Sequence, residues 1–130
     1  MKKVMAFGTF DVIHPGHIYF LNQAKKLGDT LVVLISRDKT IESVKGNPPH
    51  FNEGERMKHL EKTLIPDKVI LGTEPPSLEN LKKEKPDIIA LGYDQKFMTD
   101  KLKELKIETK RIDAFKEHIY KSSILKGSNA

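Results

Sequence analysis

The feature that most constrains the fold is a regular alternation of short apolar runs with longer segments of helical periodicity. The run at 30–36, Thr-Leu-Val-Val-Leu-Ile-Ser, is nearly continuous in β-branched and leucine side chains. Such a run is typical of a central parallel strand that is covered on both faces. Strands joined through helices form right-handed crossovers and a parallel sheet. The five predicted strands lie at residues 3–8, 30–36, 67–71, 87–91 and 107–112.

The intervening segments predict helices on both faces of this sheet. The first carries an apolar stripe of Ile18, Leu21, Ala24 and Leu27 and is stopped by Gly28. The predicted helix at 53–64 would turn its apolar side chains, Met57, Leu60 and Leu64, toward the core. Residues 37–52 contain Gly46, Pro48 and Pro49 and are predicted to form a loop. The predicted helices lie at residues 15–27, 53–64, 78–85, 96–105 and 120–126.

Length and composition indicate one folded domain, residues 1–130, in the cytoplasm. A hydrophobic content of 38% with 32% charged residues is typical of a globular rather than a disordered chain. We see no apolar run near the roughly 18 residues that cross a bilayer, and residues 1–20 lack a signal-peptide layout. Because the chain has no cysteine, a disulfide framework and thiol catalysis are both excluded.

The net charge of +5, from 23 basic and 18 acidic residues, suits an anionic ligand such as a phosphate. It does not point to nucleic acid, because lysines and glutamates are mixed along the helical segments at 82–85 and 101–106. RNA-binding aromatic motifs and zinc-finger spacings are also missing. Ligands of parallel sheets bind at the carboxyl ends of the strands, which places function after residues 8, 36 and 91 and near 113–123.

The first of these exits reads Gly-Thr-Phe-Asp-Val-Ile-His-Pro-Gly-His over residues 8–17. Pro15 suits the first helical position, and Gly16 leaves room for a ligand to approach the backbone. His14 and His17 are three residues apart in the first turn, so both imidazoles can point the same way. They stand at the positive end of the helix dipole, where unpaired N–H groups would await an anion. The motif predicts a cradle for a polyphosphate.

Other interpretations of the two histidines are weaker. Either one alone could be an ordinary core or surface residue. A zinc pair lacks the glutamate of a zincin helix, and no cysteine can complete a structural zinc site. A Walker loop and a Gly-x-Gly-x-x-Gly turn are absent, and no carboxylate cluster predicts a metal site made by the protein.

The segment Gly8-Thr9-Phe10-Asp11, followed by His14-Pro15-Gly16-His17, resembles the opening of the cytidylyltransferase-like nucleotidyltransferases. That superfamily carries a His-x-Gly-His motif on a Rossmann-like α/β fold, and the likeness extends loosely along almost the whole chain. The resemblance implies an enzyme that transfers a nucleotidyl group. It also implies a divalent cation such as Mg²⁺ arriving with the nucleoside triphosphate, and a homodimer.

Two branches of this superfamily resemble the chain. Gly92-Tyr93-Asp94-Gln95 resembles the matching loop of archaeal-type FAD synthases, which use ATP and FMN. The other branch, the glycerol-3-phosphate cytidylyltransferases, carries an Arg-Thr-Glu-Gly-Ile-Ser-Thr-Thr motif near its end. Residues 117–124 retain only the hydroxyl pair of this motif, Ser122 and Ser123. The resemblance favours FAD synthesis. A cytidylyltransferase acting on CTP and glycerol 3-phosphate and a non-catalytic nucleotide-binding module remain alternatives.

The same resemblance implies roles for individual residues. His14 and His17 would hold the α- and β-phosphates and stabilise the transition state, with Lys45 as a further phosphate ligand or a solvated loop lysine. Thr9 and Phe10 would meet the triphosphate or the nucleoside.

Later segments would complete the site. Asp94 would bind the nucleoside and Tyr120 would lie against the base, while Ser122 and Ser123 would cap the last helix and donate to phosphate. Arg56 would face the acceptor phosphate, or form a surface ion pair with one of the glutamates at 53 and 55.

Overall fold

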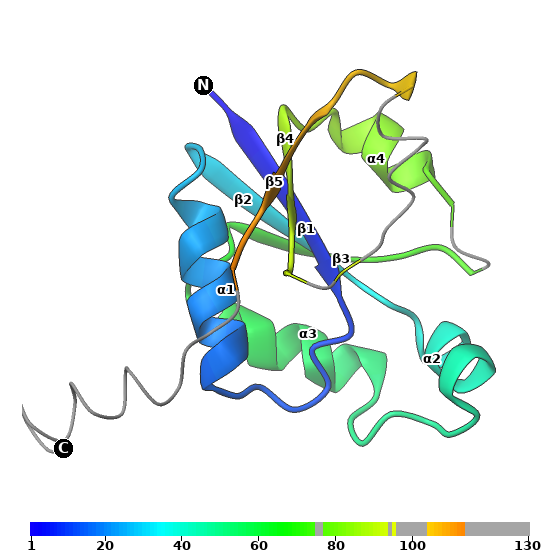
Figure 1. Cartoon of the computed structure of the whole chain (residues 1–130). Coiled ribbons are helices and arrows are strands. Elements are labelled where there is room, and N and C mark those ends of the chain that lie inside the picture. The colour runs from blue at the N-terminus through cyan, green and yellow to red at the C-terminus, as the bar shows by residue number, and fades with distance from the viewer. Residues whose placement is uncertain (75–76, 94, 96–103, 114–130) are drawn as a thin grey trace, which may run out of the picture.

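In the computed structural model of the protein, residues 1–74, 77–93, 95 and 104–113 are described (Figure 1). Five parallel strands form one sheet in the order β3-β2-β1-β4-β5. The predicted α/β fold with a five-stranded parallel sheet is therefore confirmed. The strands are β1 (Lys3–Gly8), β2 (Thr30–Ile35), β3 (Lys68–Leu71), β4 (Ile88–Leu91) and β5 (Glu108–Arg111).

Helices cover both faces of the sheet, as predicted. The helices α1 (Pro15–Lys25) and α3 (Glu53–Lys62) pack on one face, and α4 (Glu79–Glu84) packs on the other. Successive side chains of β1 alternate between the two layers: Val4 and Ala6 belong to the first core cluster, and Met5 and Phe7 to the second. Burial on both faces explains why the central strands are almost continuously apolar.

Residues 37–52 are not a single loop, as the sequence had suggested, because they contain α2 (Asp38–Lys45). Ile41 is buried and anchors this helix, while Asp38 places a negative charge in its first turn. Gly46 ends the helix with a left-handed φ of 81°. The glycine and proline cluster therefore marks the end of a short helix, and α2 lies beyond the carboxyl ends of the strands (Figure 1).

Two further helix predictions need correction or stay open. Leu64 does not face the core but is 88% exposed, because α3 ends at Lys62 and Leu64 takes a left-handed φ of 60°. Residues 96–103 of the predicted helix at 96–105, and all of the predicted helix at 120–126, lie outside the described residues. None of the described helices is both long and apolar enough to span a bilayer.

The strand order creates one switch point. The chain adds β2 and β3 on one side of β1, then crosses back to place β4 on its other side. The loops after β1 and β4 consequently leave the sheet in different directions, and a crevice forms between them at the carboxyl ends. The histidine motif follows β1, and Gly92 follows β4, so both border this crevice.

Candidate active site

The two histidines of the first turn of α1 stack on each other. Their ring centroids are 3.8 Å apart and the ring planes are 22° from parallel. The Nδ1 of His14 accepts from the Gly16 N–H at 3.1 Å, and the Nδ1 of His17 accepts from the His14 N–H at 3.3 Å. This reciprocal capping arrangement, in which His14 is the N-cap of α1, confirms that both imidazoles point the same way.

The capping bonds decide which atoms face a ligand. The first-turn N–H groups were expected to be unpaired, and this is wrong: Gly16 donates to the His14 ring and His17 donates to the His14 carbonyl oxygen at 2.9 Å. Because each Nδ1 is an acceptor, the hydrogen of the neutral ring sits on Nε2. The capping bonds thus engage the Nδ1 atoms and these two helix amides, and they leave the Nε2–H groups out of the capping arrangement.

Burial, followed by the nearby charge of His14, lowers the pKa of His17 to about 4, while the Val12 carbonyl acts weakly in the opposite direction. At neutral pH His17 is therefore uncharged and can donate a hydrogen bond. Two stacked imidazoles would repel each other if both were protonated, which is consistent with this direction.

Phe10 supports the histidine pair from a strained turn. Its φ is 48°, which is unfavourable for a bulky side chain, and its ring is only 4% exposed. The ring lies 5.1 Å from that of His17. It also covers Gly8 so closely that a Cβ atom there would lie 2.6 Å from the Phe10 Cε2. The glycine that ends β1 is thus required by the ring that holds His17.

An open pocket of about 960 Å³ lies over this turn. We call it the histidine pocket. It brings together the end of β1, the side chain of His17, the end of α2 and the loop after β4. Of the predicted site residues, Thr9, Phe10, His17 and Lys45 all line it, and its other lining residues are Phe7, Gly8, Phe20, Val44, Gly92 and Gln95.

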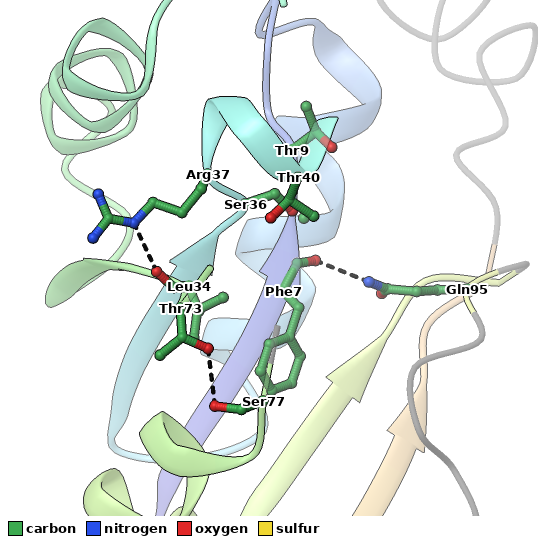
Figure 2. Close-up of a pocket in the computed structure, with 11 residues that line it drawn as sticks. Phe7, Thr9, Leu34, Ser36, Arg37, Thr40, Thr73, Ser77 and Gln95 are labelled. Atoms are coloured by element: carbon green, nitrogen blue, oxygen red, sulfur yellow. Dashed lines mark hydrogen bonds between the residues drawn. The ribbon is translucent and has the colours of Figure 1, made fainter. Parts of the chain in front are cut away.

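A second cavity of about 220 Å³ opens against the same strand end, and we call it the hydroxyl cavity (Figure 2). It is lined by the apolar residues Phe7 and Leu34 and by five residues with hydroxyl groups, Thr9, Ser36, Thr40, Thr73 and Ser77. The remaining lining residues are Gly8, Arg37, Gly72 and Gln95. The two cavities share Phe7, Gly8, Thr9 and Gln95, so they meet at the carboxyl end of β1.

Gln95 joins the two sides of the switch point. Its Nε2 donates to the Phe7 carbonyl oxygen at 3.1 Å, as Figure 2 shows, and its Oε1 accepts from the Gly92 N–H at 3.1 Å. Arg111, at the end of β5, holds the same loop by donating to the carbonyl oxygens of Gly92 at 2.6 Å and Gln95 at 2.8 Å. The loop after β4 is thereby tied to the end of β1.

Arg56 takes neither of the positions considered from the sequence. It does not lie on the helix surface, since its side chain is fully buried, and it pairs with neither neighbouring glutamate. Its guanidinium donates to the Thr9 carbonyl, the Phe51 carbonyl and the Asp38 carboxylate. Its position four residues before the buried Leu60 could have indicated this burial, because residues at that spacing share a helix face.

Four predicted site residues, Asp94, Tyr120, Ser122 and Ser123, lie outside the described residues. Pro15 occupies the first position of α1, as predicted. Within the part of the chain that is described, no group of three or more metal-ligating side chains is brought together.

Known proteins resemble this chain in sequence and in structure. A family model described as cytidylyltransferase-like matches residues 5–126. An FAD synthase of Ferroglobus placidus is 47% identical, and the match covers 88% of this chain and 78% of that protein. An FAD synthase of Archaeoglobus profundus is 45% identical, with 95% and 82% covered. A crystal structure described as a lipopolysaccharide core biosynthesis protein from Thermoplasma volcanium GSS1 superposes with a TM-score of 0.77 at 41% identity, covering 88% of this chain and 97% of that one.

Proposed function

The chain belongs to the cytidylyltransferase-like family, and on that premise we propose that it is an FAD synthase. The reaction joins ATP and FMN to give FAD and pyrophosphate. A phosphate oxygen of FMN attacks the α-phosphorus of ATP, and the bond from that phosphorus to the bridging oxygen of the β-phosphate breaks. The AMP group passes directly to the acceptor, with no covalent enzyme intermediate.

This reaction does not require the protein to remove a proton from the acceptor. The second pKa of a phosphate monoester is about 6, so FMN is already mostly dianionic at neutral pH and needs no general base. The barrier comes from repulsion between anions and from the alignment of attacking and leaving oxygens. The enzyme must therefore position the two substrates and stabilise the charge that develops on the α- and β-phosphates.

The histidine pocket suits the triphosphate of ATP. His17 lines this pocket, and His14, which is not a lining residue, stacks its ring on that of His17. The Nε2 atoms of both would donate to the α- and β-phosphates, because the Nδ1 atoms are occupied by capping bonds. Lys45, at the last turn of α2, lines the same pocket and would supply a positive charge. His17 enters the reaction as a neutral donor, in keeping with its lowered pKa.

The hydroxyl cavity suits the acceptor. It meets the histidine pocket at Gly8 and Thr9, where the phosphate of FMN would have to reach the α-phosphate of ATP. At about 220 Å³ it is smaller than pockets that enclose whole drug-sized ligands, so it fits one part of FMN, the flavin ring against Phe7. Filling it by Ser36→Leu should raise the KM for FMN and leave the KM for ATP within about twofold. An unchanged KM for FMN would place the acceptor elsewhere.

A divalent cation such as Mg²⁺ would arrive bound to the triphosphate oxygens and water, as is usual for this ion. It would neutralise charge on the leaving pyrophosphate. The described residues fit this arrangement, because His17 and Lys45 line the histidine pocket and would contact the phosphates, which leaves the metal to the nucleotide.

The observation that carries the proposal is the stacked histidine pair with both Nδ1 atoms fixed by the backbone, in a chain of which most is about 45% identical to FAD synthases. The test is an end-point assay that pairs ATP or CTP with FMN or glycerol 3-phosphate. We expect pyrophosphate and FAD from ATP with FMN alone. Turnover of CTP with glycerol 3-phosphate would make the chain a cytidylyltransferase, and no pyrophosphate from any pair would leave a nucleotide-binding module.

A further inference from the structure

Among the described residues, Arg56 is the one charged side chain that is buried, and it is fully so. A buried cation is costly unless it is paired with an anion and hydrogen-bonded. Here Nη1 donates to the Thr9 carbonyl at 2.9 Å, Nη2 to the Asp38 carboxylate at 2.7 Å and Nε to the Phe51 carbonyl at 3.1 Å. Arg56 thus joins the loop after β1, the first turn of α2 and the segment before α3.

The same loop is held from its other side by Asp11. The Asp11 carboxylate accepts from the backbone N–H groups of His50 at 2.7 Å and Phe51 at 2.8 Å. Burial opposes the charge on Asp11, but these amide bonds and the Arg56 cation outweigh it and lower the pKa of this carboxyl. Two anchors therefore flank Phe10. One is the Thr9 carbonyl before it, which Arg56 holds, and the other is the Asp11 carboxylate after it.

The residue between the anchors is the strained one. Phe10 holds a φ of 48°, and such a conformation persists only where surrounding contacts determine it. Its ring lies against His17, and the carbonyl that Arg56 holds belongs to Thr9, which lines both the histidine pocket and the hydroxyl cavity. A shift of this turn would move the imidazole and both cavities together.

We infer that Arg56 is a positioning residue for nucleotidyl transfer, which holds the Thr9–Phe10 turn and, through the Phe10 ring, sets the place of His17. It touches neither substrate. Its planar fork serves three acceptors in three segments, which the single ammonium of lysine cannot reproduce. The inference rests on the proposed function in one respect: FAD synthesis is one of the two quantities that test it, and the pKa of His17 is the other.

The test compares Arg56→Lys with Leu60→Ala. Leu60 lies one turn further along α3 and is equally buried, in the core cluster that also contains Phe10, but its side chain cannot form the hydrogen bonds by which Arg56 holds the turn. Its variant therefore measures the effect of lost core packing alone. The kcat and KM for ATP and FMN are measured well below each melting temperature. The pKa of His17 is followed by NMR of the histidine rings, which requires no activity.

In Arg56→Lys we expect kcat to fall on the order of 10²-fold, as a misplacement of about 1 Å can cause, with both KM values within about threefold. The His17 pKa should rise from about 4 toward its ordinary value as the Phe10 ring moves away. Leu60→Ala should change neither quantity. A kcat like that of Leu60→Ala, or a loss confined to KM with an unmoved His17 pKa, would overturn the inference.

If Arg56→Lys does not fold, Asp38→Asn decides the matter, because it weakens one bond of the guanidinium at a partly exposed partner. We expect about tenfold lower kcat and a raised His17 pKa, and no change in either would overturn the inference. A wild-type protein that makes no FAD would count against the proposed function instead. The His17 pKa of the variants would still test the positioning role in that case.

Discussion

Replacing His14 by asparagine and His17 by glutamine separates two tasks that each imidazole performs. Each Nδ1 accepts a capping bond at the start of α1, and each Nε2 would face the phosphates. Asparagine is among the best N-cap residues, and glutamine three residues later preserves the reciprocal capping bond. Both variants therefore keep the helix start and lose only the ring donors. His14→Ala and His17→Ala lose both.

The expected magnitudes follow from these contacts. Removing one transition-state donor costs about 2.7–4 kcal/mol, so each of the four variants should lose a factor of 10²–10³ in kcat. Losing a cap costs about 1 kcal/mol, which shifts the melting temperature of a chain of this length by about 3–5 °C. That second loss should appear in His14→Ala and be absent from His14→Asn.

Steady-state assays of pyrophosphate release, run beside thermal melts of the same preparations, measure both quantities. The comparison of His14→Asn with His14→Ala is the matched control, because the two share the loss of the ring and differ in the cap. A kcat within about threefold of wild type in His14→Asn or His17→Gln would show that the imidazoles do not act on the phosphates. A lowered melting temperature in His14→Asn would show that the cap was misjudged.

Three other predictions rest on separate contacts. Lys45→Met should raise the KM for ATP about tenfold, because a charge-assisted hydrogen bond to phosphate is lost. Lys39→Met, which lies outside the histidine pocket, should leave the KM for ATP within about twofold. Equal effects of the two substitutions would show that Lys45 is an ordinary solvated lysine. The pKa of His17 is about 4 in the folded chain and about 6.5 in the unfolded chain, so folding favours the neutral ring. The free energy of unfolding that this preference contributes is fully present above about pH 6.5 and is lost as the pH falls toward 4. In urea titrations wild type should lose free energy of unfolding relative to His17→Gln as the pH falls through that window, and a difference that stays constant with pH would contradict the pKa shift. Gly8→Ala should lower the free energy of unfolding by about 1–3 kcal/mol, because its Cβ would overlap the Phe10 ring, while Gly54→Ala in α3 should not; an unchanged Gly8→Ala would mean that the ring is free to move.

The sequence by itself determined the order of the strands along the chain, the parallel sheet with helices on both faces, and the position of the two histidines in the first turn of α1. These depend on periodicity and on local backbone chemistry, which neighbouring residues carry. The apolar run of β2, the proline that starts α1 and the spacing of His14 and His17 are visible without any tertiary contact. The resemblance of the motif then named the family, and the comparisons confirmed it.

Only the tertiary structure decided what the polar side chains near the motif do. Arg56 is charged and lies on a helix, so its sequence neighbours suggest a surface ion pair, yet its partners are 5, 18 and 47 residues away. The first-turn amides of α1 were expected to await an anion, but both donate to His14 instead, Gly16 to its ring and His17 to its carbonyl oxygen. Hydrogen bonds of this kind join segments that meet only after the sheet has formed. Local propensity cannot report them, because the free energy of burying a charge depends on partners supplied by the whole fold.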